Sequence, residues 1–533
     1  MSDLKRLLLF LVVVTGLRCL VATSFPLFAV EAYYWLWGQY PAAGYYDHPP
    51  MVGWMSALFL GWAPGSELAA RSAPIVLGAV SSLAIYAMVR DMFQGGRIAW
   101  RAAAICTITP MLNLNGVLIQ PDNSLVLFAV LTWWLFWRAS EQGVETGRPA
   151  GAAVWLCAGG AAGLTLLSKF HAWVLLPPLW GFLALSPRHR PLLRTPGPWL
   201  AAAAALAVVS PDLWWNARHE WVNYAFQWRR SGLGEVRFGL ENVLLFALAP
   251  ALMLSPLLYV AMLAAAWRGF GIWRRTGDSA LLYLLCAGLP LPLFLGALSP
   301  FVSISAHWPA AGFIPLLALT VVLFEKNGST RRRFYRASVA VCVATTVCAG
   351  VGPFLVRALP HSLSLPFRPE LVNTGRLRRE YVGWREIGTK AREMRDALER
   401  DSGTPTAIMA DGWHLSSMLA FYSGQPREVF ALEEGPAHNF AIWMSERGGL
   451  KGCNAVVVEK SKPQKHSPIG LKVRRRREQL QTQFERVEAA PSLIIHPDGS
   501  VSEFSGENIT VPRLREFLIF RCYGFSGELA HDS

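Results

Sequence analysis

The sequence predicts a mainly α-helical, polytopic membrane protein with an α/β domain at its C-terminal end. Of 533 residues, 53% are hydrophobic and only 16% are charged, and the mean hydropathy is +0.31. A soluble enzyme of this length would be more polar. The 22 tryptophans and 35 prolines fit membrane helices and their interfaces. The formal charge of +14 comes mainly from lysines and arginines spread among short loops, which argues against nucleic-acid binding.

Apolar runs of the length that crosses a bilayer, roughly 20 residues, recur as far as residue 357. The first run follows Lys5 and Arg6 without a small-residue cleavage site, so we interpret it as a transmembrane helix rather than a signal peptide. It contains Arg18, which we expect to be paired or to reach the interface. About eleven spans are predicted in this way, near residues 7–27, 72–89, 99–117, 123–138, 151–168, 171–186, 197–213, 240–263, 279–299, 308–325 and 336–357.

The loops between these spans predict the orientation of the chain. Alternate loops rich in arginine are expected to face the cytoplasm, together with the N-terminus. These loops hold Arg90, Arg97 and Arg101; Arg188, Arg190 and Arg194; Arg268, Arg274 and Arg275; and Lys326 with Arg331, Arg332, Arg333 and Arg336. The opposite loops, at 28–71, 120–122, 169–171, 212–237 and 300–307, hold every motif of chemical interest. An odd number of spans also places the C-terminus on this outer side.

Residues 360–533 differ in character from the predicted membrane domain, 1–359. Charged residues become more frequent and apolar runs become shorter. A helical pattern of apolar residues covers 384–400. Three short runs predict buried strands, at 407–410, 455–458 and 492–495. We therefore expect a small extracytoplasmic α/β domain. Cys453 and Cys522 lie in it, and the sequence leaves open whether they pair.

The first outer loop, 28–71, carries two acids and a histidine. Glu31 lies at the mouth of a membrane helix, where a carboxylate is costly without a purpose; a solvated acid or an interfacial anchor is the alternative. Asp47 and His48 precede two prolines that fix the backbone. The pair can bind a phosphate, a metal or a sugar hydroxyl, or Asp47 only caps the interfacial helix predicted at 51–62.

Two further outer turns carry charged side chains. Asp122 begins a span, where it is either a second functional acid or the N-cap of the helix. Lys169 lies in a tight turn beside His171, and its ammonium group either neutralises a phosphate presented by the membrane or extends to the interface. His307, before a later span, is another outer-face candidate, with a structural role as the alternative.

The segment from Ser210 to Arg230 is dense in aromatic rings and hydrogen-bonding groups. A sugar stacks its apolar faces on tryptophan, and its hydroxyls need amide or imidazole partners. This composition predicts sugar contacts, with an ordinary aromatic belt at the membrane interface as the alternative. The candidates are Trp215, Asn216, His219 and Gln227.

At these residues the chain resembles the GT-C superfamily of membrane glycosyltransferases. The resemblance is to the bacterial relatives of dolichyl-phosphate-mannose protein mannosyltransferases and of the aminoarabinose and galacturonic acid transferases that modify lipid A and lipopolysaccharide core. The motifs that carry it are Glu31-Ala-Tyr-Tyr-Trp-Leu-Trp37, Tyr45-Tyr-Asp-His-Pro-Pro50, Gln120-Pro-Asp122, Gly163-Leu-Thr-Leu-Leu-Ser-Lys169, Ser210–Gln227, His307-Trp-Pro309, Gly383-Trp-Arg-Glu386, Ala410-Asp-Gly-Trp-His414 and Leu419–Pro426. They cover nearly the whole chain and are specific in combination.

The resemblance implies inverting transfer of a hexosyl or pentosyl group from a polyprenyl-phosphate-linked donor. The acceptor would be a glycolipid (lipid A, core or O-antigen) or a protein, on the periplasmic face of the bacterial inner membrane. Glu31 would act as general base or acceptor-orienting acid, Asp122 as a second acid, and Lys169 would neutralise the donor phosphate. Asp47 and His48 would lie at the phosphate or at an optional divalent cation. Weaker phosphate candidates are Arg71, Arg229 and Arg230.

One position departs from the family pattern. The family's first loop usually carries an Asp-Glu pair, whereas Val30 precedes Glu31 here, so either Glu31 or Asp122 takes the role of base or the activity differs. A transporter or flippase of lipid-linked sugars stays open as an alternative, as does a catalytically silent family member. No spaced ligand set argues for a metal, and the sequence names neither the sugar nor the acceptor.

Overall fold

The chain divides into two compact units. The computed structural model describes residues 2–63, 65–145, 151–230, 238–325, 329–358, 381–432, 438–446, 450–461, 469–496, 500–504 and 515–527. The first unit consists of Met1–Ala22, Ala42–Met55 and Arg71–Val351. The second consists of Thr23–Pro41, Ser56–Ala70 and Gly352–Ser533, so it takes two segments of the predicted first outer loop. The predicted domain boundary at 359/360 lies outside the described residues.

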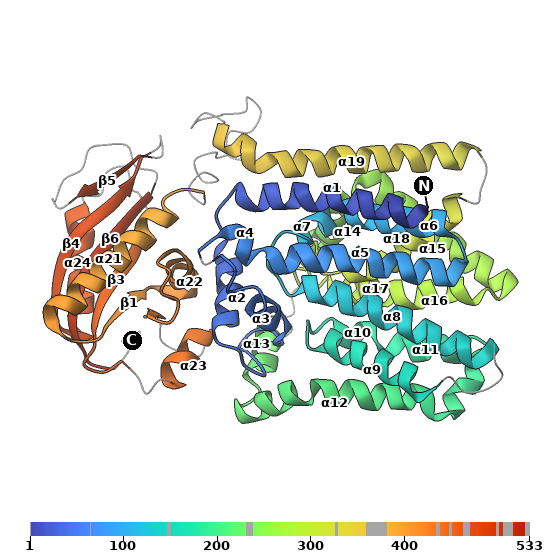
Figure 1. Cartoon of the computed structure of the whole chain (residues 1–533), viewed down its shortest axis with the longest axis horizontal. Coiled ribbons are helices and arrows are strands. Elements are labelled where there is room, and N and C mark those ends of the chain that lie inside the picture. Colours follow the sequence, from blue (N-terminus) through green and yellow to red (C-terminus); the bar gives the residue numbers. More distant parts are fainter. Residues whose placement is uncertain are drawn as a thin grey trace. The chain divides into compact units, whose positions relative to one another are not determined.

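Helices, most of them apolar, build the first unit. They are α1 (Asp3–Thr23), α3 (Met51–Ala57), α5 (Ser72–Phe93), α6 (Gly96–Ile108), α7 (Pro110–Asn115), α8 (Asp122–Glu145), α9 (Ala152–Leu166), α10 (Ala172–Leu175), α11 (Pro177–Leu185), the 3-10 helix η1 (Arg190–Arg194), α12 (Pro196–Arg218), α13 (Val222–Arg230), α14 (Leu240–Leu254), α15 (Pro256–Thr276), α16 (Ser279–Gly288), α17 (Pro290–Leu298), α18 (Ala310–Glu325) and α19 (Ser329–Ala358). Figure 1 shows α1, α5, α8, α12 and α19 running along a common direction.

Helix length and composition identify the membrane-spanning part. Among the described residues, five helical stretches are long and apolar enough to cross a bilayer: Asp3–Thr23, Ser72–Phe93, Pro256–Thr276, Ser279–Leu298 and Arg333–Gly352. Four shorter apolar helices accompany them, Ala152–Leu166, Ala172–Leu185, Leu240–Leu254 and Ala310–Glu325. The chain is thus a mainly helical membrane protein, and the total of about eleven spans stays a prediction.

Prolines divide several of the predicted spans into two helices. The run 240–263 is broken at Ser255, which has a φ of 89° and precedes Pro256, so α14 ends there and α15 continues to Thr276. The run 279–299 is likewise divided at Pro290. Proline lacks the N–H that would continue the helical ladder and its ring clashes with the preceding turn, which a count of apolar residues does not reveal.

Small residues and one buried arginine shape the packing of the first unit. A Cβ on Gly159 would lie 2.3 Å from the carbonyl oxygen of Ala201, so α9 and α12 approach closely because glycine stands there. Arg18 on α1 is 3% exposed. Its Nε donates to Asn113 Oδ1 at 3.0 Å and its Nη2 to the Thr107 carbonyl at 3.4 Å. Of the two alternatives predicted for Arg18, the structure shows a buried side chain with hydrogen-bond partners rather than one that reaches the interface.

A mixed sheet forms the centre of the second unit. The elements are α2 (Ala29–Gln39), α4 (Glu67–Ala70), α21 (Trp384–Ser402), β1 (Thr406–Ala410), α22 (Gly412–Tyr422), β2 (Val429–Ala431), α23 (Asn439–Glu446), β3 (Asn454–Ser461), α24 (Ile469–Leu480), β4 (Phe484–Ile495), β5 (Val501–Phe504) and β6 (Arg515–Phe525). The strand order is β2-β1-β3-β6-β4-β5. The first three strands are parallel and the remaining pairings antiparallel. All three predicted strands and the predicted helix at 384–400 are confirmed.

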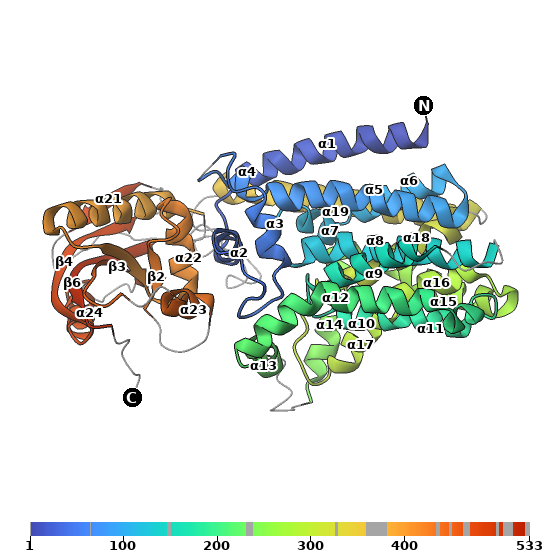
Figure 2. The same cartoon turned by 60° about the horizontal axis from the view of Figure 1, so that its bottom comes forward.

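Alternating side chains let the sheet bury both faces. Met409 and Val457 pack in one core with Leu480 of α24, whereas their sequence neighbours point to the opposite face because successive strand residues alternate. Helix α21 presents an apolar stripe that includes Ile387 and Met394. Figure 2 shows α21 and α24 on opposite faces of the sheet. Cys453 and Cys522 are both free thiols.

Helix α2, from the N-terminal part of the chain, packs within this second unit through aromatic side chains. The rings of Trp35 and Phe421 lie 4.8 Å apart, edge to face. The hydroxyl of Tyr33 accepts hydrogen bonds from the backbone and side-chain amides of Asn439, both at 3.0 Å. The interfacial helix predicted at 51–62 is shorter than expected, because α3 ends at Ala57 and turns follow.

Candidate active site

A buried ion pair joins two turns of the first unit that the sequence predicts on the outer side. Asp122 is the first residue of α8, and Lys169 lies between α9 and α10. Lys169 Nζ and Asp122 Oδ2 are 2.7 Å apart, and the two side chains expose only 6% and 7% of their surface. The ammonium group therefore does not extend to an interface. The Asp122 carboxylate instead accepts a hydrogen bond from it and holds it in place. Both side chains were singled out from the sequence, and the structure brings them together.

Three histidines lie near this pair: His171 and His307 interact electrostatically with Asp122, and His48 interacts with His171. His171 interacts electrostatically with Lys169, Asp122, His48 and His307. Its ring centroid lies 5.3 Å from that of Trp308, and its Nδ1 is buried without a hydrogen-bond partner in the part of the chain that the structure describes. Four segments distant in sequence thus converge on the ion pair.

Backbone contacts hold the Asp47-His48 turn in this place. The Met51 N–H donates to the Leu167 carbonyl at 3.1 Å, which ties the start of α3 to the end of α9, just before Lys169. The Trp54 indole donates to the Ala42 carbonyl at 2.8 Å. The two prolines between His48 and Met51 then allow little freedom to the turn.

The segment 210–230 closes over the same turn. Asn223 Nδ2 donates to the Tyr45 carbonyl at 2.9 Å, and Gln227 Nε2 donates to the Asp47 carbonyl. A Cβ on Gly44 would lie 2.5 Å from the Trp215 ring, so the loop rests directly on that indole. Gln227 is therefore part of the site, but its amide positions the backbone.

Trp215 and His219 are arranged differently from the sequence-based expectation. Their rings stack 3.9 Å apart with an interplanar angle of 16°, and Trp215 is 8% exposed. The indole contacts His219 and the Gly44 backbone, so its packing is internal. Asn216 is fully buried, and its Nδ2 donates to the Asp212 carbonyl at 3.0 Å.

Three buried oxygen acceptors lie in this region, and two of them, on Asp212 and Asn223, were missed by the sequence analysis. The Oδ1 atoms of Asp212, Asn216 and Asn223 are buried without a hydrogen-bond partner among the described residues. Asp212 is 2% exposed. Buried acceptors of this kind are costly unless a ligand or water supplies donors. The available signal was the acid itself, because a carboxylate at the end of an apolar run is rarely accidental.

Two of the remaining candidates, Glu31 and Arg71, have hydrogen-bond partners within their own unit. Glu31 belongs to the second unit, is 2% exposed, and its Oε2 accepts from the Phe28 N–H at 3.0 Å, as the third residue of a helix does in a capping box. Val30 beside it is 43% exposed. Arg71 is fully buried and donates to the Ala22 carbonyl at 2.7 Å. Arg229 is exposed, and the side chain of Arg230 lies outside the described part.

The cluster offers cationic and imidazole groups but no obvious metal cage. Among the described residues no three His, Cys, Asp or Glu side chains are grouped so that they could hold a metal ion. The Lys169 ammonium and neighbouring imidazole N–H groups can instead stabilise an anion directly. In a water-poor site such preorganised donors act more strongly than they would in water.

Comparison with known sequences gives two matches. A family model described as dolichyl-phosphate-mannose-protein mannosyltransferase matches residues 47–215, which include Asp47, Asp122, Lys169 and Trp215. The lipid A galacturonosyltransferase RgtD of Rhizobium johnstonii is 26% identical over 394 residues, which cover 73% of this chain and 75% of that protein. Both matched descriptions are of transferases rather than transporters.

Comparison with solved structures shows the fold. The structure of ArnT from Cupriavidus metallidurans bound to undecaprenyl phosphate matches with a TM-score of 0.59 and 14% sequence identity, over 97% of this chain and 98% of that one. The apo form of the same protein matches with a TM-score of 0.55 and 13% identity, over the same shares. The likeness extends over both units.

Proposed function

We propose that the chain is a membrane glycosyltransferase of the GT-C superfamily, and that it transfers a glycosyl group from a polyprenyl-phosphate-linked sugar to an acceptor hydroxyl. We place the reaction on the periplasmic face of the bacterial inner membrane, with residues 360–533 on the same side, because the arginine-rich loops predict that orientation. The undecaprenyl phosphate bound by the ArnT structure supports the class of donor.

The proposed acceptor is a glycolipid of the lipopolysaccharide: lipid A, its core or the O-antigen. The matched RgtD protein is named as acting on lipid A, and its similarity covers most of both chains, which favours this class. A protein acceptor is the second candidate, since the family model is described as a protein mannosyltransferase.

The Lys169–Asp122 pair is the observation that carries the proposal. In the reaction the acceptor oxygen attacks the anomeric carbon, the bond from that carbon to the phosphate oxygen breaks, and polyprenyl phosphate leaves with added negative charge. The acceptor proton passes to a carboxylate. Lys169 lies in a buried outer turn, where its ammonium group can stabilise the departing phosphate, and Asp122 holds that group in position.

The surrounding side chains suit the rest of the donor. His48, His171 and His307 act electrostatically on one another or on the ion pair, and each imidazole can donate an N–H to phosphate oxygens. Sugar hydroxyls are donors that would satisfy the buried oxygens of Asp212, Asn216 and Asn223. The proposed donor site therefore has a cationic end for phosphate and an acceptor-rich end for sugar.

Two carboxylates are proposed for the base. Asp122 lies in the ion-pair cluster. Glu31, which belongs to the second unit, is proposed on the family resemblance. The variants Asp122→Asn and Glu31→Gln each remove one charge at nearly constant shape. The loss of sugar transfer in one variant and not the other would identify the base.

A comparison of membrane glycolipids tests the function. Mass spectrometry of lipid A, core and O-antigen from cells with and without the protein should show one sugar that depends on it. Cells carrying Lys169→Met should lack that sugar, whereas Lys451→Met, which removes the same charge from an exposed turn, should retain it. Identical glycolipids with and without the protein, together with unchanged protein glycosylation, would refute the proposal.

A further inference from the structure

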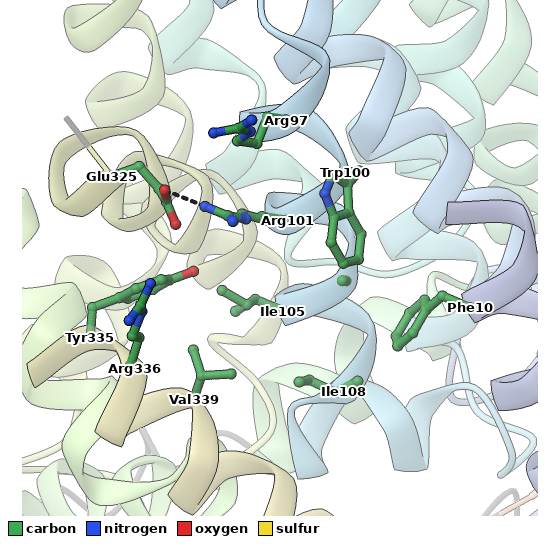
Figure 3. Close-up of a pocket in the computed structure, with 11 residues that line it drawn as sticks. Phe10, Arg97, Trp100, Arg101, Ile105, Ile108, Glu325, Tyr335, Arg336 and Val339 are labelled. Carbon is green, nitrogen blue, oxygen red and sulfur yellow. Dashed lines mark ion pairs between the residues drawn. The ribbon is translucent and has the colours of Figure 1, made fainter. Parts of the chain in front are cut away.

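A cavity of about 490 Å³ lies in the first unit among α1, α6, α18 and α19. Figure 3 shows its lining, with Arg97, Arg101 and Trp100 of α6 opposite Tyr335 and Arg336 of α19. None of these side chains takes part in the site described above.

One end of this cavity is basic. Among its described lining residues are Arg97, Arg101 and Arg336 and one acid, Glu325. Arg101 forms an ion pair with Glu325, and no other acid among these described lining residues balances Arg97 and Arg336. Arg97 and Arg336 are exposed. An anion entering here would meet guanidinium groups from two helices.

The other end of the cavity is apolar, and helix geometry explains why. Along α6, Arg97 and Arg101 are followed on the same face by Ile105 and Ile108, at intervals of three or four residues. Phe10 of α1 and Val339 of α19 complete the apolar wall. The lining of the cavity thus changes from charged to apolar along the axis of α6. A phospholipid changes in the same way from its headgroup to its acyl chains.

The cavity and the ion-pair site lie at opposite ends of the helices. Asp91, near the end of α5, accepts from the Trp134 indole at 2.8 Å, and α6 begins a few residues further on. Trp134 lies twelve residues after Asp122 along α8, roughly 18 Å of helix. Arg97, Arg101 and Arg336 also belong to the loops that predict the cytoplasmic side.

We propose that this cavity is a binding site for an anionic phospholipid of the cytoplasmic leaflet. Its headgroup phosphate contacts Arg97, Arg101 and Arg336, and one acyl chain lies along Phe10 and the isoleucines of α6. A basic pocket between membrane helices on this side suits such a headgroup. Zwitterionic lipids lack the net charge that the unbalanced arginines favour, and a free phosphate would leave the apolar half unfilled.

Native mass spectrometry of the full-length protein tests the proposal. Protein in nanodiscs of equal parts phosphatidylglycerol and phosphatidylcholine, with identical acyl chains, should release with phosphatidylglycerol attached. Each arginine near an anionic lipid contributes about fivefold to its affinity. In the double variant Arg97→Gln/Arg336→Gln, the ratio of lipid-bound to lipid-free protein should therefore fall by roughly 25-fold. Arg101 is left unchanged because its ion pair with Glu325 has a structural role.

Three controls make the result decisive. Arg274→Gln/Arg275→Gln removes two exposed arginines at the end of α15 and should leave the adduct intact. Arg97→Lys/Arg336→Lys should largely restore it. Equal melting temperatures in phosphatidylcholine alone exclude misfolding. Unchanged adducts in the glutamine variant, or complete displacement by excess inorganic phosphate or by polyprenyl phosphate, would overturn the assignment.

Discussion

Lys169 and Asp122 form a salt bridge of 2.7 Å between two turns that are 47 residues apart in the sequence. Both side chains are almost completely buried, and burying two charges costs more free energy than an exposed pair would. A chain that needed only to join two helices would do so more cheaply with apolar residues. The proposed role of the pair in transfer accounts for this cost, and it leads to the first prediction.

Lys169→Met should lower the free energy of unfolding by about 3–5 kcal/mol, because Asp122 keeps an unpaired buried charge, and lower transfer by ~10²–10³-fold. The double variant Lys169→Met/Asp122→Asn should regain most of the stability and none of the activity. Thermal unfolding of the purified protein and glycolipid mass spectrometry measure the two effects. Recovered transfer in the double variant would reduce the pair to a structural element.

Glu31→Gln should abolish transfer and leave the protein folded in membranes. Glutamine keeps an acceptor for the Phe28 N–H, so the cap of α2 survives while the charge is lost. Glu31→Ala, which removes the cap as well, is the comparison that shows what capping contributes to stability. Near-normal transfer by Glu31→Gln would leave Asp122 as the remaining acid.

Asp212→Asn should raise the KM for the donor by roughly 10- to 100-fold with a smaller change in kcat, since a hydrogen bond to a charged group contributes about 1.5–3 kcal/mol. Steady-state kinetics with the donor identified from the glycolipids would measure it. Asp278→Asn makes the same change at the N-cap of α16 and should have no effect, because asparagine also caps. An unchanged KM would show that Asp212 does not contact the sugar.

Gly44→Ala should reduce transfer and lower the unfolding free energy by about 1–3 kcal/mol, because the new Cβ would lie 2.5 Å from the Trp215 ring. The loop that carries Asp47 and His48 would have to move. Gly160→Ala is the matched control, since a Cβ there has nothing within 4 Å and alanine favours a helix. Equal activity of both variants would mean that the loop tolerates displacement.

The second unit should lose stability in mild acid through His438. Burial lowers the pKa of His438 to about 4, against about 6.5 in an unfolded chain. As the pH falls, the unfolded state therefore binds a proton before the folded state does. The free energy of unfolding has its full value above pH 6.5 and falls, by up to about 3 kcal/mol, as the pH drops toward 4.

Hydrogen exchange of helix α23 in the full-length protein measures this loss, as protection factors at about pH 7.5 and about pH 5. His438→Asn removes the titrating group and should flatten the difference. Protection in the native protein that does not change with pH would contradict the prediction.

The fold class could be predicted from the sequence because it depends on the content of apolar residues and on their spacing along the chain. The strand at 455–458 is buried on both faces, and such a strand appears as a continuous apolar run. Helix boundaries in the membrane were less accessible. Ser255 divides one predicted span into two helices, and only backbone geometry distinguishes a kink from a break.

Some residues of the candidate site were singled out from the sequence. Asp122, Lys169 and His48 were identified as chemically unusual for their positions, and they lie together. Trp215 was expected to stack on a sugar, but its ring contacts His219. Composition reports which groups are present, whereas the direction of each side chain depends on contacts between distant segments. Asp212 was passed over because it appeared to be only the first residue of a loop.

Helix α2 has a consequence for how the protein is made. Its aromatic side chains Tyr33 and Trp35 contact residues of α22 and α23, which leave the ribosome about 370 residues after α2. At 5–20 residues per second this is roughly 20–75 s of synthesis. During that interval the helix lacks its partners in α22 and α23, and a nascent chain stalled within the membrane domain exposes an aromatic surface that quality-control proteases or chaperones can recognise.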